Sequence, residues 1–256
     1  MDPSALPPTL KVETAAEALR KEILRGAFGT DGQLPTEPEL AKRFGAARET
    51  VRRALQFLKE RGLVVSRQGT GTFVRPRPQR TVLWADPTVD RDNTGYTFHK
   101  TTNPWVALHA SGPRRENVPA DLVEDLGVGH DSEVVIWTAL MGVPETDQPL
   151  QLATTYVPHH IAERLADLGT QDTVPDVSRL ENSGPALSWS VEIGARMPER
   201  SEAAALKSPT GVPLVQFLRI GRQAGAVVEI TECLLSSERF RIGYDLLPEA
   251  CAESSL

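Results

Sequence analysis

Residues 12 to 62 alternate apolar and polar positions at the spacing of three short helices. The first is predicted by an apolar stripe at three- and four-residue intervals: Val12, Ala15, Ala16, Leu19 and Ile23. The second begins after Thr36, a suitable N-cap for which Glu39 completes a capping box, and Gly45 ends it. The third runs from about Arg48 to Arg61, ends at Gly62 and carries the stripe Val51, Ala54, Leu55 and Leu58.

Two short alternating runs follow these helices. Leu63–Ser66 and Thr72–Arg75 are predicted strands, and Arg67–Gly71 is a glycine-rich tip that can approach a phosphate chain closely. Helices followed by such a hairpin make a winged helix, in which a tight turn separates the second helix from the third. We therefore expect a compact N-terminal domain over residues 11–75, after an arm of residues 1–10 that we expect to be disordered.

The exposed side of the third predicted helix is basic. Arg48 and Arg52 are four positions apart and project from one side, next to Glu49 and Arg53. A basic start to the second helix of a helix-turn-helix is typical of DNA recognition. The alternative is an ordinary helical hairpin with a solvated arginine face.

From Val118 onward the pattern becomes that of alternating strands with short helices. Strands are predicted at 133–141, 148–157, 188–196, 214–220, 227–235 and 240–246, and helices at 119–126, 159–168 and 201–206. This order favours an antiparallel α+β domain over residues 118–248 with its helices on one side of a single sheet, and a tail at 249–256. Residues 76–117 give no such pattern. We interpret them as a proline-rich linker and an irregular covering segment, in which 81–116 forms a helix or an ordered loop.

Charge separates the two regions. The chain of 256 residues has a net charge of −6, but residues 1–80 hold 15 Lys/Arg against 9 Asp/Glu, and the remainder holds 13 against 25. A basic first third on an acidic body fits a DNA-contacting domain whose remainder is repelled by phosphates.

Other kinds of chemistry find little support. Cys233 and Cys251 lack metal-type spacing, and Cys233 lies in a strand-like run, so we expect a buried thiol and a reducing cytoplasm. No signal peptide, apolar run of about 20 residues or cofactor motif is evident, so neither a membrane partner nor a cofactor is expected. Neighbouring His159 and His160 face different ways on a helix, and no catalytic or metal-binding set is found.

The N-terminal pattern resembles the DNA-binding domain of the GntR family of bacterial transcription regulators. The motifs that carry the resemblance are Leu34-Pro-Thr-Glu37, Glu39-Leu-Ala41, Arg48-x-Thr-Val-Arg-x-Ala-Leu55, Leu58-x-x-x-Gly-Leu63 and Gly69-Thr-Gly-Thr-Phe-Val74. The resemblance implies that the third helix reads base edges and that the wing enters the minor groove. The DNA-binding residues it implies are Thr36, Arg48, Glu49, Thr50, Arg52, Arg53, Gln68, Gly69, Thr70 and Gly71.

Two positions depart from that family's pattern. Pro38 stands where an arginine is common, and Ala47 stands where a serine or threonine commonly precedes the recognition arginine. Pro38 removes a DNA contact, and Ala47 removes a hydroxyl that could cap the helix or touch a phosphate. The operator sequence therefore cannot be inferred from a relative.

The C-terminal pattern is similar to the UTRA effector domain of the HutC subfamily, whose fold resembles chorismate lyase. The residues that carry this likeness are Pro149–Pro158, Arg179-Leu-Glu181, Ala195-Arg-Met-Pro198, Glu202-Ala-x-x-Leu206, and Val228-Glu229 with Leu235 and Arg239-Phe240. The likeness implies a small-molecule cleft on the sheet. The candidate effector residues are Trp137, Thr154, Tyr156, Trp189, Arg196 and Glu229.

The first strand of this domain lacks the arginines that suit a phosphate, since it reads Ile136-Trp-Thr-Ala139. That favours a neutral ligand or one that stacks on the tryptophans. The alternatives are that both tryptophans pack in the core and that Glu229 lies on a solvated face.

Together these features predict a homodimeric, effector-modulated repressor on a palindromic operator in double-stranded DNA. An effector-independent repressor of the plasmid-transfer type is the second interpretation, and a lyase-like enzyme is the third.

Overall fold

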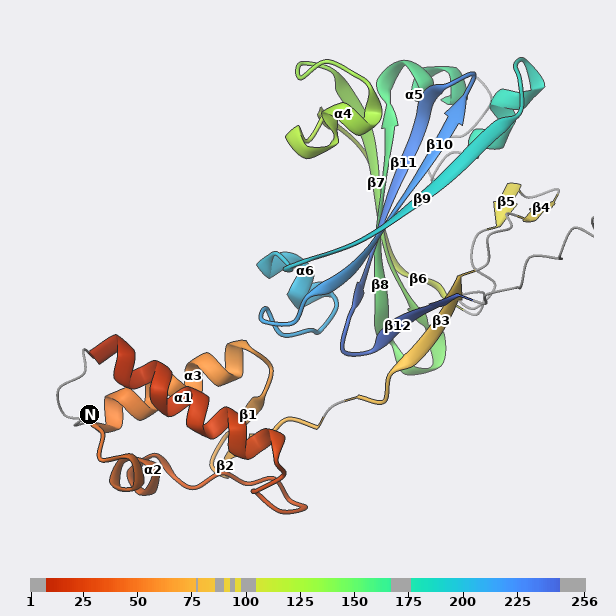
Figure 1. Cartoon of the computed structure of the whole chain (residues 1–256). Helices are drawn as coiled ribbons and strands as arrows, with labels where there is room; N and C mark the ends of the chain where they lie inside the picture. Colours follow the sequence, from red (N-terminus) through yellow and green to blue (C-terminus); the bar gives the residue numbers. More distant parts are fainter. Residues whose placement is uncertain are drawn as a thin grey trace, which may run out of the picture. The chain divides into compact units, whose positions relative to one another are not determined.

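The computed structural model describes residues 8–76, 78–85, 90–92, 95–97, 105–166 and 176–244 (Figure 1). The chain divides into two compact units. The first comprises Met1–Pro78 with Arg196–Leu214, and the second Gln79–Ala195 with Val215–Leu256. His99, most of the predicted N-terminal arm and the predicted tail at 249–256 lie outside the described residues, and the first helix already begins at Pro8.

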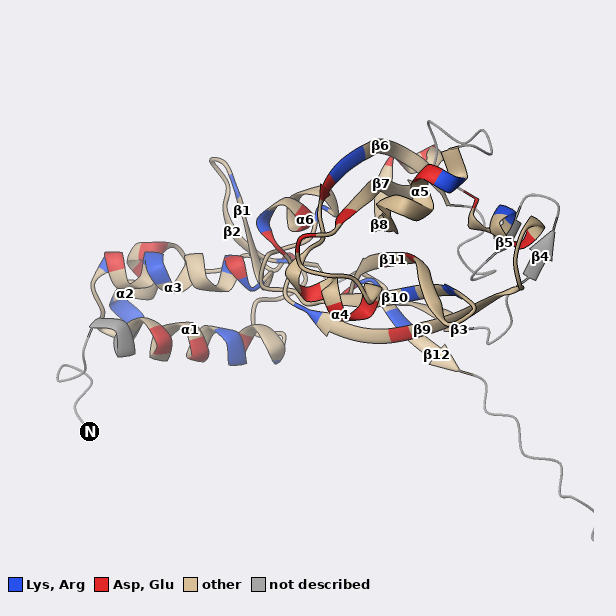
Figure 2. Ribbon diagram, turned by 90° about the horizontal axis from the view of Figure 1, so that it is seen from above, with Lys and Arg blue, Asp and Glu red and all other residues tan. Residues whose placement is uncertain are grey.

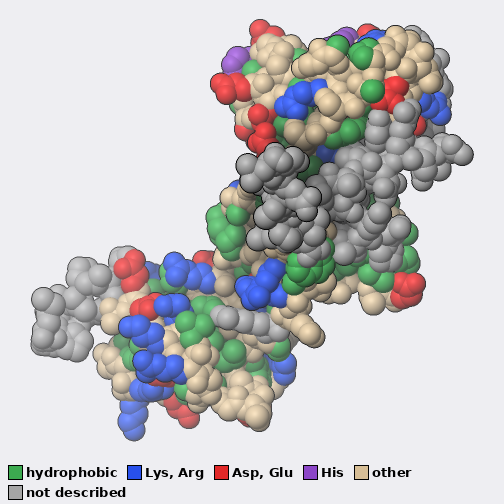
Figure 3. Space-filling model, turned by 45° about the vertical axis from the view of Figure 1, so that its right-hand side comes forward, with side chains coloured by type: hydrophobic (Ala, Val, Ile, Leu, Met, Phe, Trp, Pro, Cys, Tyr) green, Lys and Arg blue, Asp and Glu red, His purple; other side chains and the backbone are tan. Residues whose placement is uncertain are grey.

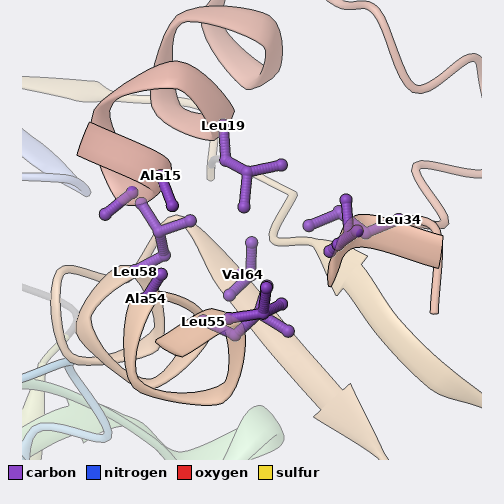
Figure 4. Packing of buried hydrophobic residues seen from close by; sticks show 10 residues of the cluster. Ala15, Leu19, Leu34, Ala54, Leu55, Leu58 and Val64 are labelled. Carbon is purple, nitrogen blue, oxygen red and sulfur yellow. The ribbon is translucent and has the colours of Figure 1, made fainter. Parts of the chain in front are cut away.

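The first unit has the predicted three helices and hairpin. Its elements are α1 (Pro8–Leu24), α2 (Glu37–Phe44), α3 (Arg48–Glu60), β1 (Val64–Arg67), β2 (Gly71–Val74) and α6 (Arg200–Ala205). The apolar stripes of α1 and α3 meet in one core, where Leu19, Val51 and Leu58 are at most 1% exposed. Figure 4 shows Leu19 of α1, Leu58 of α3 and Val64 of β1 among the side chains that meet in this core.

The ends of α2 and α3 follow their sequence signals. The Glu39 carboxylate accepts a hydrogen bond from the Thr36 backbone N–H at 2.8 Å, and Gly45 ends α2 with φ +56°. At the end of α3, Gly62 has φ +67°, and the N–H groups of Gly62 and Leu63 bond back to Lys59 and Leu58. That pattern is the Schellman motif, which favours glycine because other residues are strained there.

The wing is an antiparallel pair, β1 with β2, in which Arg67 lies opposite Gly71. The chain before α2 runs beside β2, because Leu34 N–H bonds to the Thr72 carbonyl and Val74 N–H to the Gly32 carbonyl. The hairpin is therefore braced from one side by residues 32–34.

The second unit is built on a six-stranded sheet in the order β6-β7-β8-β11-β10-β9. The strands are β6 (Val106–Asn117), β7 (Glu133–Val143), β8 (Gln148–Pro158), β9 (Leu187–Arg196), β10 (Leu214–Gln223) and β11 (Ala226–Ser236). Strand β6 pairs with β7, β7 with β8 and β8 with β11, each antiparallel, as predicted. Outside this sheet, β3 (Thr81–Ala85) pairs in parallel with β12 (Phe240–Tyr244), and β4 (Asp90–Asp92) pairs with β5 (Gly95–Thr97).

Both faces of the sheet are covered. One face packs Ile136 and Ile230 against η3 (Ala120–Leu122) and α4 (Val123–Leu126). The other packs Trp137 and Val157 against α5 (His159–Ala166) and η5 (Val177–Asn182). A short turn, η4 (Pro144–Thr146), joins β7 to β8.

The structure differs from three of these expectations. Helices lie on both faces of the sheet and not on one, because the run from Val134 to Trp137 is apolar on both faces. The segment 81–116 holds strands β3 and most of β6 where a helix or loop was expected. The edge strand β6 is exposed at nearly every position, so it has no apolar alternation to reveal it. The last strand, β12, leaves the main sheet to pair with β3.

Candidate nucleic-acid interface and effector site

The two arginines at the start of α3, Arg48 and Arg52, differ in their ion pairs. Arg48 is exposed and makes no ion pair within the described part of the chain, whereas Arg52 is held at 3.2 Å from Glu37 and 3.3 Å from Glu49. The Glu37 carboxylate raises the pKa of Arg52 above its ordinary value, with Glu49 adding to the effect. Arg48 is thus available to a base edge, while Arg52 is pre-oriented by two acids. Figure 2 marks the positions of the charged residues along the ribbons of α2 and α3.

Glu49 also holds Arg53, with Nε at 3.2 Å from Oε1. One carboxylate therefore positions two exposed arginines of the same helix. Thr50 is half-buried beside them. At the start of α3 the N-cap is Ala47, which makes no side-chain capping bond, as its lack of a hydroxyl predicts.

The Thr36 hydroxyl is already engaged inside the protein. Its Oγ1 lies 2.8 Å from the Glu39 carboxylate, which also accepts the Thr36 backbone N–H. These two bonds lower the pKa of Glu39. The structure thus gives Thr36 a role in starting α2, and contact with DNA would add to that role.

The wing tip combines two left-handed glycines with exposed polar atoms. Gly69 has φ +71° and Gly71 has φ +124°, and the tip is closed by a 3.1 Å bond from Thr70 N–H to the Arg67 carbonyl. Gln68 and Thr70 are exposed on either side of Gly69. Figure 3 shows several patches of Lys and Arg side chains on the first unit.

Sequence reasoning missed Gln33, which braces the wing. Its Nε2 donates to the Thr70 carbonyl at 3.1 Å, and its backbone bridges to Phe73. The only sequence signal is its place just ahead of the Leu34–Glu37 motif.

In the second unit, a buried polar band crosses the sheet. It consists of Thr155 on β8, Glu229 and Thr231 on β11 and Arg219 on β10, with Trp137 and Trp189 at its two ends. Arg219 Nη2 lies 2.8 Å from Glu229 Oε1 and 3.0 Å from Thr231 Oγ1, which in turn is 3.0 Å from Thr155 Oγ1. Glu229 is only 3% exposed, so the alternative that it lies on a solvated face is wrong.

The tryptophans complete the band and also pack in the core. Trp137 is paired with Thr155 across β7 and β8, and the guanidinium of Arg219 lies 5.6 Å from the Trp189 ring. Both rings belong to the apolar cluster on this face. The Trp137 indole nitrogen is buried and has no hydrogen-bond acceptor among the residues described.

The other candidate effector residues lie elsewhere. Strand alternation places Thr154 and Tyr156 on the opposite face, where Tyr156 packs against the cluster beneath α4. Arg196 ends β9 and makes a two-bond ion pair with Glu202 at 2.7 and 2.8 Å, which lowers the pKa of Glu202. The six residues predicted for one cleft therefore occupy three places.

Arg219 is the important residue that sequence reasoning did not select. Its signal was a lone cation inside the apolar run Leu214–Ile220, one hairpin before Glu229. The half-buried Cys233 lies beside the band. Burial raises the pKa of its thiol to about 11, so the thiol stays protonated and unreactive at neutral pH.

No group of three metal-ligating side chains occurs in the described ranges, and no helix within them is long and apolar enough to cross a bilayer. The arrangement is that of a DNA-contacting winged helix followed by a sheet domain. Residues 11–74 match the model of the bacterial regulatory proteins of the gntR family, and residues 112–241 match the UTRA domain. The chain therefore belongs to the GntR family of transcription regulators and carries a UTRA domain, in the manner of the HutC subfamily.

Characterised relatives agree with this assignment. The chain is 26% identical to the transcriptional repressor NagR of Bacillus subtilis, over 88% of this chain and 89% of NagR. It is also 26% identical to the histidine utilization repressor of Pseudomonas aeruginosa, over 86% and 85% of the two chains. A 32% match to the regulator Rv0792c of Mycobacterium tuberculosis covers 62% of this chain but only 55% of that relative. Among solved structures, a GntR-family regulator aligns with TM-score 0.58 at 20% identity, over 93% of this chain and 98% of that one.

Proposed function

We propose that this protein is a cytoplasmic, homodimeric repressor that binds a palindromic operator and is modulated by a small molecule bound in its UTRA domain. The observation that carries the proposal is Arg48, which is exposed and has no ion pair among the described residues. It opens a helix-turn-helix recognition helix, beside the pre-oriented Arg52. An arginine there can bond a guanine in two places. The two winged-helix domains of a dimer would reach successive major grooves about one helical turn apart.

The wing would supply the second contact. The hairpin tip, which would enter the minor groove, offers side-chain and backbone donors from Gln68, Gly69, Thr70 and Gly71. Thr36, Glu49, Thr50 and Arg53 would contact or orient groups at the phosphate backbone. Such contacts fix the register of the protein on DNA, and Arg48 and Arg52 would supply the sequence information.

Within the UTRA domain, we infer that the effector contacts the polar band. The Trp137 indole N–H could donate to a ligand acceptor, and Trp189 offers an aromatic face. Glu229 and Arg219 would position the ligand's hydroxyl or amine groups by opening part of their ion pair. Thr154, Tyr156 and Arg196 would act from other places, by transmitting a change to the opposite face or to the end of β9. A difference in effector affinity between two conformations would then change operator affinity.

An effector-independent repressor is the second candidate. It is favoured by the same polar band, since Arg219 and Thr231 already bond the Glu229 carboxylate, Thr155 bonds Thr231, and both tryptophans pack in the core. An enzyme is the weakest candidate, because relatives that match most of the chain are regulators and a fold alone carries no activity.

The decisive experiment is to sequence the genomic fragments retained by the wild-type protein and by Arg48→Ala at near-physiological salt. We expect a palindromic motif with the wild type, and a loss of about 1–3 kcal/mol of specific binding in the variant. Equal, motif-free retention by both proteins would refute the proposal. Small molecules processed by the products of neighbouring genes would then be tested for release of the operator. If none of them changes operator affinity, the result supports the effector-independent repressor.

A further inference from the structure

An open groove of about 490 Å³ lies within the first unit. It is bounded by the C-terminal end of α3, the start of β1 and the loop that follows α6. Its lining includes Val64 and Val65, and a volume of this size suits a small organic molecule. None of the residues given a DNA or effector role above lines it.

The wall formed by the loop after α6 is fixed against α3. Three of the last four carbonyls of α3 accept bonds from its own C-terminal turn, and the fourth, that of Glu60, accepts the Gly211 N–H at 2.7 Å. A side-chain carbon at Gly211 would lie 2.3 Å from this carbonyl oxygen, so only glycine permits the approach. The groove therefore has two defined sides.

All the charged side chains that line the groove are positive. Lys59, Arg75, Arg200 and Lys207 contribute from both sides, and no Asp or Glu is among the lining residues. A concave surface lined by one sign of charge attracts the opposite charge, because the surrounding protein focuses the field. An anionic group is therefore the favoured occupant.

Lys207 holds an unfavourable backbone conformation at this place. Its φ is +48°, and its N–H bonds to the Ala204 carbonyl at 3.1 Å, in the position after a helix where glycine is usual. A lysine here is strained, and strained residues gather at binding sites. The side chain is exposed at the groove.

We propose that this groove binds a small organic anion, with its phosphate or carboxylate among Lys59, Arg75, Arg200 and Lys207 and its apolar part against Val65, which is partly exposed. DNA is a poor fit for the same place. Lys59 lies eleven positions after Arg48, roughly 16 Å further along the helix axis. A bound anion would link α3 to the loop after α6 and so stabilise their contact.

The test is calorimetric titration of the full-length protein with 1-naphthyl phosphate. Parallel titrations use 1-naphthoate, inorganic phosphate and uncharged 1-naphthol. We expect saturable binding of the naphthyl anions, weaker binding of inorganic phosphate and none of naphthol. The better of phosphate and carboxylate identifies the acid group. Equal binding of naphthol, or no saturable binding of either naphthyl anion, would overturn the proposal.

Variants locate the site. Arg200→Gln combined with Lys207→Gly should lower the affinity at least tenfold, while Arg164→Gln, an exposed arginine on α5, should leave it unchanged. Lys207→Gly alone should weaken binding without lowering the melting midpoint, because glycine relieves the strained φ. If Lys207 had a structural role instead, this substitution would lower the melting midpoint. Unchanged affinity in the double variant, or equal loss in Arg164→Gln, would disprove the site. Arg48→Ala should bind the anion normally, so failure here is distinguishable from failure of the DNA-binding proposal.

Discussion

The two regions of this protein place their polar residues in opposite ways. In the winged helix, the candidate DNA-contacting side chains are mostly exposed. Those of Thr36, Arg52 and Arg53 are held by carboxylates of the same or the adjoining helix. In the sheet domain, Thr155, Glu229 and Thr231 are each at most 4% exposed and are satisfied by partners on other strands. An exposed surface can be altered one residue at a time, whereas a buried network responds as a whole.

This difference has a consequence for stability. A surface ion pair such as Arg52–Glu37 contributes little to folding because water screens it. Removing one partner of a buried pair leaves the other charge uncompensated in a poorly hydrated place. Changes to the two regions should therefore separate into effects on DNA binding and effects on folding.

The largest expected effect is that of Glu229→Ala, which leaves the Arg219 guanidinium without its carboxylate. We expect the free energy of unfolding of the second unit to fall by about 3 kcal/mol. Tryptophan fluorescence during urea unfolding measures it, because all four tryptophans lie in that unit.

Two further variants sharpen this measurement. Glu192→Ala removes an exposed glutamate of β9 and should leave the unfolding midpoint nearly unchanged. Adding Arg219→Met to Glu229→Ala should recover much of the loss, since no lone charge then remains. If Glu229→Ala alone lowers the free energy of unfolding by less than about 1 kcal/mol, the band is hydrated and behaves like the winged-helix surface.

The same contrast explains what the sequence could predict. The caps Thr36, Glu39 and Gly45 act within one helix, so local residue types sufficed to predict α2 and its neighbours. In the sheet domain, strands with clear alternation were predicted well, but the faces of their side chains depend on register across the sheet. Trp137 and Thr154 were assigned to one cleft although their strands direct them to opposite faces.

Long-range pairing limits prediction further. Arg219 and Glu229 look like scattered charges until β10 and β11 are paired. The exposed edge strand β6 gives no alternation at all, and β12 leaves the main sheet for a parallel partner some 160 positions away in sequence, as the Phe240–Thr81 pairing shows. A single sequence does not encode such pairings in its local pattern.

A smaller effect distinguishes the two recognition arginines. Arg48→Lys keeps the charge but loses the two-bond geometry, so specific operator affinity should fall about tenfold while binding to unrelated DNA stays the same. Arg52→Lys should cost less, because Glu37 and Glu49 already occupy part of its guanidinium. Competition binding with operator and random duplexes measures both. Equal loss on both duplexes would assign Arg48 to the phosphate backbone.

The smallest expected effect concerns the capping box at the start of α2. Because bonds from Thr36 lower the pKa of Glu39, its ionised form stabilises the folded state at neutral pH. That contribution is present above the ordinary glutamate pKa of 4.5 and is lost as pH falls through the lower folded pKa. Glu39→Gln can still accept a hydrogen bond but cannot titrate. The free energy of unfolding of the first unit should therefore change less between pH 6 and pH 3 in this variant than in the wild type. Far-UV circular dichroism of urea unfolding at these two pH values measures this, with Glu13→Gln on α1 as the control. An unchanged pH dependence in Glu39→Gln would mean that the winged helix, like the sheet domain, depends on pairings beyond its local signals.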